Sequence, residues 1–551
     1  MTGIQHIKWF KSTKNQVPCD LTKGENKMRN TFSQALESEL TLNETVRTEN
    51  GAVAFASTGK PFLDAFWKIS SCRNIQDEKE IIRIFAPCFR EDFTLACKLL
   101  FYIRDCRQGC GEKRTFNILF NWLLSKSDSA TKLIKLIPEY GSWKDIVQLI
   151  AKTGDVSLYE LVQSQLDEDI KNFKKGKSIS LLAKWLPSIN TSSKETVKLA
   201  KEFCKRLGYR HAKWRKLLSA LRKHIDVIER KMCSGDWSEI DYNTVPSKAN
   251  LIYKNAFMKH DGERRSQYLE KLARGDEDVK INAGVLEPYE IVHKYCQNMR
   301  SYGWNSASLT DEDASLEALW KNLPRTDILQ GKNMICVHDN SGSMSSPAGE
   351  GATCHNVADA LAIYCSELLS GPWKNKFITF SENPKLVDLS DCDTLAEKIT
   401  TLYKKIEIAN TNIERVFDLI LKTAIANHSE QEEIPDILIL SDMEFDNGIS
   451  FSDGYHWGPE FELRKKTLFE DIAKKWASAG YKLPKLIYWN ICSRTMGIPV
   501  RENDNGVLLV SGFSKNIFKM VASAKLDPFE ALKDQLNVPR YEAVEKALTE
   551  D

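Results

Sequence analysis

Several familiar patterns are missing from this sequence of 551 residues. No apolar run is long enough to span a membrane as a helix, so we predict no membrane segment. The first twenty residues carry lysines but no apolar core, and we therefore expect no secretory signal. The 14 cysteines include no Cys-x-x-Cys pair, which favours buried thiols over a zinc site. Together these absences predict a cytoplasmic protein with reduced cysteines.

Two catalytic patterns are absent as well. The nucleophile-elbow string Gly-x-Ser-x-Gly does not occur, and strand alternation turns His338 away from the serines that follow it. Residues 104–114 contain glycines between basic residues but lack the Lys-Ser/Thr ending of a phosphate-binding loop. We expect no nucleotide hydrolysis there, although the flanking bases are a second candidate contact for phosphate. We predict that the protein is not an enzyme.

The net charge of +2 conceals an uneven distribution along the chain. Residues 1–325 contain 53 Lys+Arg and 41 Asp+Glu, a difference of +12. Residues 326–551 contain 24 Lys+Arg and 34 Asp+Glu, a difference of −10. Opposite charge in the two halves predicts a different kind of partner for each half. The basic half is the candidate for binding nucleic acid.

Hydrophobic periodicity divides the chain into four parts. Residues 1–30 are polar and lysine-bearing, and we expect a flexible basic arm. Between residues 31 and 325, apolar side chains recur at steps of three and four, which predicts an α-helical domain. Short Gly- or Pro-marked connections indicate a bundle or a HEAT-like solenoid, and we favour a degenerate solenoid. Residues 326–526 alternate strands and helices, which predicts a doubly wound parallel α/β domain, and residues 527–551 form a helical tail.

Basic residues are densest between residues 194 and 231, where 13 Lys+Arg accompany four acids. Lys and Arg on a helix neutralise phosphates, and an aromatic ring among them stacks an unpaired base. The alternative is a solvated helix face with the tryptophan of this segment in the core, and the sequence leaves both open. The candidate nucleic-acid-binding residues are Lys201, Lys205, Arg206, Arg210, Lys213, Trp214, Arg215, Lys216, Arg222 and Lys223.

Oxygen-bearing side chains follow two predicted strands of the α/β domain. One apolar strand ends in Asp339, and Ser341 and Ser343 stand on the turn beside it. Thr411 precedes an amphipathic helix, and Asp442 ends a second apolar strand. Open α/β sheets bind ligands at the carboxyl ends of their strands, so we expect these five side chains to converge. Oxygen donors of this kind suit Mg²⁺ or Mn²⁺ better than zinc.

This spacing resembles the metal-ion-dependent adhesion site of von Willebrand factor A domains. Each of the five residues stands at a matching position, and none departs from the pattern. The resemblance implies that the hydroxyls bind the metal directly and that the second acid acts through water. It also implies that a carboxylate from a partner completes the coordination octahedron.

A helical half followed by an A-like domain resembles the Ro autoantigen (TROVE) class, and more closely a family of unknown function that shares this architecture. The segments that carry the closer resemblance are residues 48–52, 104–114, 140–145, 182–187 and 286–291. The Ro class implies a ring of helical repeats sealed by the A domain. Misfolded RNA ends enter the hole of such a ring, and small structured RNA binds its outer basic face.

Two hypotheses follow from these patterns. In the first, the protein is a monomeric RNA-binding scaffold of a ribonucleoprotein, with a Mg²⁺-dependent A domain that serves recognition or stability. In the second, it is a protein-interaction module whose metal captures a carboxylate of a partner protein, and the basic helices are merely solvated. Neither hypothesis involves a membrane.

Overall fold

The computed structural model describes residues 45–298, 312–380, 383–405, 413–445, 468–499, 506–523 and 527–550. The predicted arm, residues 1–30, lies outside these ranges. The α/β domain is built on a six-stranded sheet with the strand order β10-β9-β8-β3-β6-β7. Its strands are β3 (Met334–Asp339), β6 (Lys376–Phe380), β7 (Lys385–Asp388), β8 (Asp436–Ser441), β9 (Leu486–Asn490) and β10 (Val507–Ser511).

The sheet is parallel except at one edge. Strands β10, β9, β8, β3 and β6 pair in parallel, whereas β7 pairs antiparallel with β6. Parallel neighbours need a crossover of a dozen or more residues, and the short connection from β6 to β7 cannot supply one. The predicted α/β fold is therefore confirmed, with an antiparallel edge strand in place of a fully parallel sheet.

Helices cover both faces of the sheet. Met334 and Cys336 of β3 belong to one core, with α18 (Cys354–Leu368), α22 (Phe518–Val521) and α23 (Pro528–Leu536). Ile335 and Val337 belong to the opposite core, with α20 (Glu414–Asn427) and α21 (Leu468–Ser478). Successive side chains of a strand point to opposite faces. All six residues of β3 are consequently buried, as expected for a parallel strand covered on both sides.

The first described segment packs on the α/β domain. Strands β1 (Thr45–Arg47) and β2 (Val53–Phe55) form a hairpin, and Phe55 of this hairpin forms an antiparallel β-bridge with Ile498. In α2 (Pro61–Trp67), Leu63 and Trp67 join the core that contains α20 and α21. The indole Nε1 of Trp67 donates to Gly497 O at 3.0 Å. The start of the described chain is thus part of the sheet domain.

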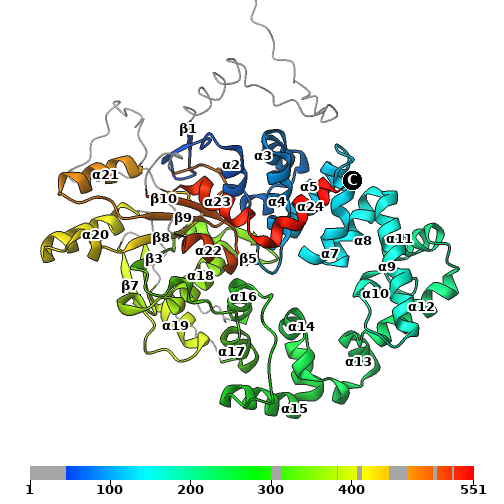
Figure 1. Cartoon of the computed structure of the whole chain (residues 1–551). Coiled ribbons are helices and arrows are strands. Elements are labelled where there is room, and N and C mark those ends of the chain that lie inside the picture. The colour runs from blue at the N-terminus through cyan, green and yellow to red at the C-terminus, as the bar shows by residue number, and fades with distance from the viewer. Residues whose placement is uncertain are drawn as a thin grey trace, which may run out of the picture.

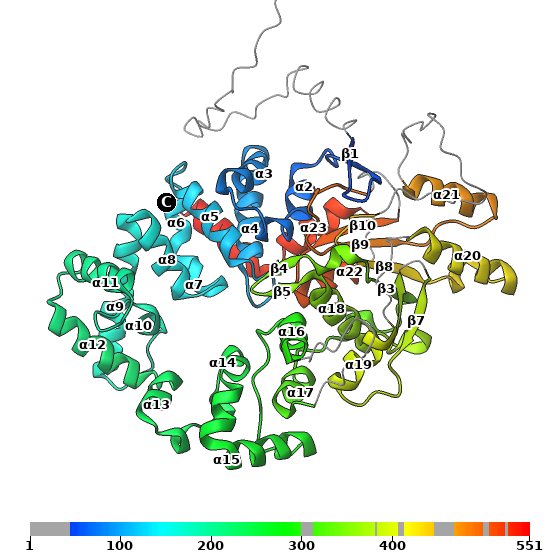
Figure 2. The same cartoon turned by 180° about the vertical axis from the view of Figure 1, so that it is seen from behind.

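The helices between α2 and α18 form an arc that leaves the α/β domain and returns to it (Figures 1 and 2). The arc comprises α3 (Glu78–Glu91), α4 (Phe93–Arg104), α5 (Lys113–Leu124), α6 (Ala130–Leu133), α7 (Ile137–Tyr140), α8 (Trp143–Thr153), α9 (Val156–Lys174), α10 (Leu182–Trp185), α11 (Lys194–Arg206), α12 (His211–His224), α13 (Ile228–Ser234), α14 (Ser247–Ile252), α15 (Lys254–Arg274), α16 (Pro288–Asn298) and α17 (Ala314–Lys321). The predicted helical character of this half is confirmed. None of the described helices combines the length and apolar character needed to cross a membrane.

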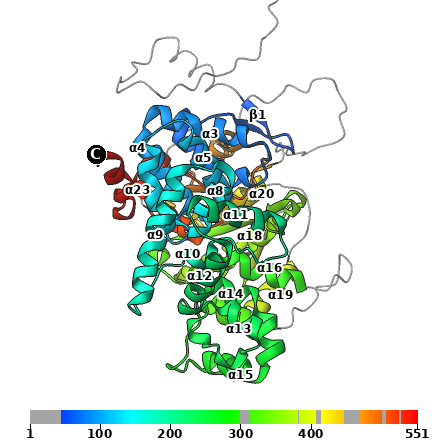
Figure 3. The ribbon, with the colours of Figure 1, turned by 90° about the vertical axis from the view of Figure 1, so that its right-hand side faces the viewer.

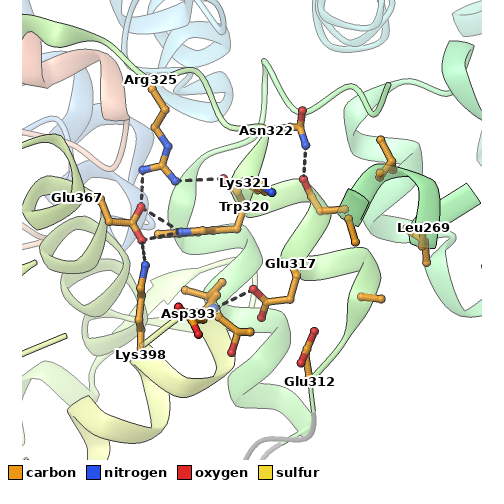
Figure 4. A pocket seen from close by; sticks show the side chains of 16 residues that line it. Leu269, Glu312, Glu317, Trp320, Lys321, Asn322, Arg325, Glu367, Asp393 and Lys398 are labelled. Atoms are coloured by element: carbon orange, nitrogen blue, oxygen red, sulfur yellow. Dashed lines mark hydrogen bonds and ion pairs between the residues drawn. The ribbon is translucent and has the colours of Figure 1, made fainter. Parts of the chain in front are cut away.

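The arc rejoins the α/β domain where α16 packs on α18 and α17 packs on α19 (Leu395–Lys405). A cavity of about 430 Å³ lies at this junction (Figure 4). Glu367 of α18 pairs there with Arg325 at 2.5 Å and with Lys398 at 2.7 Å. Glu317 of α17 accepts from the first two backbone N–H groups of α19 at 2.8 and 3.0 Å. These acids tie the end of the arc to the sheet domain.

The C-terminal tail packs back on the beginning of the arc. Helix α23 contacts α2 and α4, and α24 (Glu542–Thr549) contacts α4 and α6. The buried carboxylate of Asp105 accepts from Arg540 Nη2 at 2.9 Å and from Tyr541 Oη at 3.1 Å. The short β4 (Pro347–Gly349) and β5 (Ala352–Thr353) complete the described strands.

Candidate metal centre and basic surface

Four of the five predicted metal ligands lie at the carboxyl ends of the neighbouring strands β3 and β8. Asp339 is the last residue of β3, Asp442 directly follows β8, and both side chains are fully buried. Ser341 Oγ lies 2.8 Å from Ser343 Oγ, which donates to Asp442 Oδ1 at 3.3 Å. The structure thus brings four of the five predicted residues together. Thr411 lies outside the described residues.

Hydrogen bonds fix the carboxylate of Asp339. The backbone N–H of Ser341 donates to Oδ1 at 2.9 Å, and Ser441 Oγ donates to Oδ2 at 2.6 Å. Burial raises the pKa of Asp339, and these hydrogen bonds oppose that effect. Burial and the neighbouring charge of Asp339 raise the pKa of Asp442 to about 7. A cation between two such buried carboxylates would relieve the cost of their charge.

The donor set fits a hard divalent cation. It offers two carboxylates and two hydroxyls, the oxygen ligands that Mg²⁺ and Mn²⁺ accept. Within the described ranges, no group of three His, Cys, Asp or Glu side chains is placed to hold a metal ion. A metal centre at this edge of the sheet therefore depends on the two serines as well as on the acids.

Two left-handed residues shape the loops beside these ligands. Met443 follows β8 with φ of 62°, and Cys492 follows β9 with φ of 76°. Residues with side chains seldom adopt this conformation, and they persist where surrounding contacts hold them. Met443 N donates to Ser441 Oγ at 2.8 Å, and Cys492 N donates to Ser70 Oγ at 3.0 Å. These turns bring the loop after β9 against the loop after β8.

The sequence prediction missed Arg494, which reaches the site from the loop after β9. Its Nη1 donates to Asp442 Oδ2 at 3.0 Å and to Ser346 Oγ at 2.7 Å. Its Nε and Nη2 donate to the two carboxylate oxygens of Glu49, each at 2.6 Å. No local pattern marks Arg494, whereas Glu49 lies in the segment 48–52 that carries the family resemblance.

Glu444 holds the loops around the site together. Its buried carboxylate accepts from the backbone N–H groups of Glu49 at 2.8 Å, Arg494 at 2.8 Å and Thr495 at 2.9 Å. Residues 48–50, Glu444 and the loop after β9 consequently form one hydrogen-bonded unit at the mouth of the site.

On the other face of β3, His338 Nε2 lies 2.8 Å from Asp359 Oδ1, as strand alternation predicts.

Eight of the ten predicted nucleic-acid-binding residues are exposed on or between α11 and α12, at the far side of the arc from the sheet (Figures 1 and 3). None of the eight forms an ion pair with an acidic residue in the described part of the chain. We call these residues the basic surface: Lys201, Lys205, Arg206, Arg210, Lys213, Arg215, Lys216 and Lys223.

The other two predicted residues are structural. Trp214 has no exposed surface, and its Nε1 donates to Pro187 O at 3.0 Å. A base cannot stack on a ring without an exposed face, so the assignment of Trp214 as a stacking residue is wrong. Arg222 donates to the backbone oxygens of Ala183 at 2.8 Å and Leu186 at 2.6 Å. The guanidinium of Arg222 is therefore engaged with α10 and the loop after it, which corrects this residue from an RNA contact to a structural residue.

Comparison with known proteins places the helical half in a family. Residues 48–160 and 156–328, together half of the chain, match the model of a family described as Domain of unknown function (DUF2828). The chain belongs to the DUF2828 family. Residues 333–547 match a second model, described as Domain of unknown function (DUF7788). The predicted membership of a two-part family of unknown function is thereby confirmed.

This DUF2828 protein is also similar to a viral protein and to a solved structure. It is 29% identical over 518 residues to Uncharacterized protein L728 of Acanthamoeba polyphaga mimivirus, covering 87% of this chain and 84% of that protein. Its structure resembles that of the Deinococcus radiodurans RO (RSR) protein with a TM-score of 0.33 and 13% identity. That match covers 82% of this chain and 92% of the other.

The second candidate phosphate contact of the DUF2828 protein, residues 104–114, is partly occupied internally. Arg104 Nη2 donates to the buried carboxylate of Asp145 at 2.7 Å. Arg114 Nη1 donates to Cys72 O at 2.9 Å, and Arg107 donates to a backbone oxygen of α7. Arg104 is therefore a structural residue, whereas Arg107 and Arg114 are exposed, and their contact with phosphate stays a prediction.

Proposed function

We propose that this protein is a cytoplasmic, non-enzymatic RNA-binding scaffold that binds small or misfolded RNA on its basic surface. The observation that carries the proposal is the set of eight exposed bases on adjoining helices, none paired with a described acid. Phosphates that meet such bases release counterions, which drives binding independently of sequence. A monomer suffices, because the whole surface belongs to one chain.

The surroundings of the basic surface support this proposal. Residues 194–224 contain 11 Lys+Arg and only two Asp+Glu. His224 Nε2 lies 2.7 Å from Lys177 O, which joins the end of α12 to the chain after α9. Lys174, Lys175 and Lys177 are exposed there. The positive surface therefore continues from α11 and α12 toward α9, and offers an RNA strand a path longer than one helix.

Binding of labelled single-stranded RNA, measured by fluorescence anisotropy between 50 and 200 mM salt, tests the proposal. In the test variant, Lys213, Arg215 and Lys216 are changed to Glu. Each lost phosphate contact should flatten the slope of log affinity against log salt by about 0.7, or about 2 for three contacts. The control variant changes the exposed Lys404, Lys405 and Lys422 of the α/β domain to Glu, and its slope should remain that of the wild type.

Two outcomes contradict RNA binding at this surface. The first is the absence of binding by the wild type at the lowest salt concentration. The second is an equal loss of affinity in the test and control variants, because the effect would then reflect net charge alone.

The proposal includes a Mg²⁺ or Mn²⁺ ion in the α/β domain, for recognition or stability. Asp339, Ser341, Ser343 and Asp442 would hold it, with Thr411 as the fifth residue. Bound there, the cation would supply positive charge to two buried acids and an open position for an oxygen ligand. Asp339→Ala should abolish the rise in melting temperature on adding Mg²⁺, measured by differential scanning fluorimetry.

The control for the metal experiment is an acid at the edge of the same sheet. Asp388→Ala removes an exposed carboxylate of β7 and should leave the Mg²⁺-dependent rise unchanged. A rise that persists in Asp339→Ala would contradict the proposed metal centre.

One observation favours a second function, capture of a partner protein through its carboxylate. Glu49, whose side chain is 47% exposed, already presents a carboxylate at the mouth of the site through Arg494. A partner carboxylate reaching the metal would take a comparable position. If the protein binds no RNA at low salt while Asp339→Ala abolishes metal stabilisation, this alternative is supported over the first.

A further inference from the structure

We infer that Arg494 is a built-in counter-cation that sets the affinity of the proposed metal centre, and that Glu49 positions it. This inference rests on the metal centre proposed above. It assigns a role to two residues that lie outside the five predicted ligands and that come from distant parts of the chain.

The site is rich in negative charge. Asp339, Asp442 and Glu444 are fully buried, and Glu49 stands at the mouth. Among the described residues, Arg494 is the cationic side chain that contacts two of these carboxylates, those of Asp442 and Glu49. A buried carboxylate without a counter-charge is costly. Arg494 therefore balances part of the negative charge of the site when no metal is bound. Its single positive charge does not neutralise all the carboxylates, so a divalent cation would still be attracted.

Arg494 also binds the same oxygen atoms that a metal would need. Its Nη1 donates to Asp442 Oδ2 at 3.0 Å and to the backbone oxygen of Ser343 at 3.3 Å. The other oxygen of Asp442 accepts from the Ser343 hydroxyl at 3.3 Å. Both oxygens of Asp442 are therefore engaged while Arg494 is in place. A divalent cation, bound directly or through water, competes with these donors and is repelled by the guanidinium charge.

Glu49 gives Arg494 a second anion to pair with. The turn that carries Glu49 is anchored, because Thr48 Oγ1 donates to Phe445 O at 2.6 Å and Asn50 Nδ2 donates to Glu444 O at 2.6 Å. Arg494 can thus release Asp442 and keep the bidentate pair with Glu49. Without Glu49, the guanidinium has a stronger preference for Asp442, and the metal should bind more weakly.

Isothermal titration of the EDTA-treated full chain with manganese chloride tests the inference. Arg494→Gln should bind Mn²⁺ at least tenfold more tightly than the wild type, about 1.4 kcal/mol. Glu49→Gln should bind it about threefold more weakly. Because Glu49 acts through Arg494, its effect should largely disappear when Arg494→Gln is also present.

Arg47→Gln is the matched control. It removes the same charge as Arg494→Gln, from the hairpin that carries Glu49, but Arg47 Nη1 donates to Gly51 O at 2.7 Å and Arg47 touches none of the four carboxylates. Its Mn²⁺ affinity should stay within twofold of the wild type. Circular dichroism of each protein in EDTA establishes that the fold is retained, and the exposed position of Glu49 keeps that variant informative if Arg494→Gln unfolds.

The outcomes separate the inference from the metal centre itself. Unchanged or weaker Mn²⁺ binding by Arg494→Gln overturns the inference, as does equal tightening in Arg47→Gln. An equal effect of Glu49→Gln with and without Arg494 overturns the positioning role of Glu49. If the folded wild type binds no Mn²⁺, the proposed metal centre fails and takes the inference with it. Wild-type binding that is lost in Asp339→Ala leaves the metal centre standing whatever Arg494→Gln does.

Discussion

Replacing Asp105 by Asn will loosen the C-terminal helix from the start of the arc. Asp105 is fully buried, and its oxygens accept from Arg540 Nη2 at 2.9 Å and from Tyr541 Oη at 3.1 Å. An asparagine keeps the shape of the side chain but removes the charge. The NH₂ group of the asparagine can only donate, so it would face the donor groups of Arg540 or Tyr541 without forming a hydrogen bond to them.

The size of the effect follows from the burial of this pair. Removing one partner of a buried ion pair costs about 3–5 kcal/mol. Arg540 is 16% exposed and retains Glu139 at 3.3 Å, so we expect the lower end, about 3 kcal/mol. A loss of this size should reduce the protection of backbone amides in α24 against hydrogen exchange by roughly 150-fold.

Hydrogen exchange followed by mass spectrometry on peptides that cover residues 542–549 measures this change. Lys135→Gln is the control, because it breaks an exposed pair with Glu550 whose side chains are 56% and 65% exposed. Such surface pairs contribute about 0–1 kcal/mol, so the control should lose less than fivefold in protection. A loss in Asp105→Asn no larger than that of the control would refute the assignment of Asp105 as the anchor of the tail.

Two further changes test individual side chains. Trp214→Phe should lower the free energy of unfolding in urea by about 2–4 kcal/mol, because the core loses volume and Pro187 O loses its donor. RNA affinity should stay the same, and a fall in affinity of the folded variant would restore a stacking role. Lys113→Met tests a titration, because burial lowers the pKa of Lys113 to about 8 although Asp145 opposes it. The folded state then loses this proton before the unfolded state does, so the wild type should gain stability on the variant as the pH rises from 8 to 10.5. A difference in urea midpoint between the wild type and Lys113→Met that stays constant over that pH range would contradict the lowered pKa of Lys113.

The sheet and the core of the candidate site follow from local patterns. Apolar strands that end in Asp339 and Asp442 are visible in the sequence, and parallel pairing necessarily brings their carboxyl ends to one edge. The antiparallel direction of β7 could not be predicted from its residues, since the apolar alternation of a strand is the same in either direction. Its direction follows from the length of the connection, which is too short for a crossover.

The contacts of Arg494 could not be predicted in this way. Arg494 and Glu49 are 445 positions apart, and no periodicity or motif links them. Their pairing depends on how the β1–β2 hairpin packs against the loop after β9, which is a property of the whole fold.

Trp214 is an intermediate case. It shares one helical stripe with the buried Leu218 and Leu221, so the apolar periodicity favoured the core and the surrounding bases favoured RNA.

The hairpin and α2 at one end of the chain, and α24 at the other, each pack on the half to which they do not belong in sequence. A cut near residue 330 would leave Leu63 and Trp67 on the helical fragment without their cover. The α/β fragment would carry away α24 with the bare apolar side of Val544 and Ala547. Both pieces would expose surface that drives aggregation. Because segments near each end of the chain pack on the opposite half, the two halves depend on each other for a complete core. Expressing them separately should yield insoluble material.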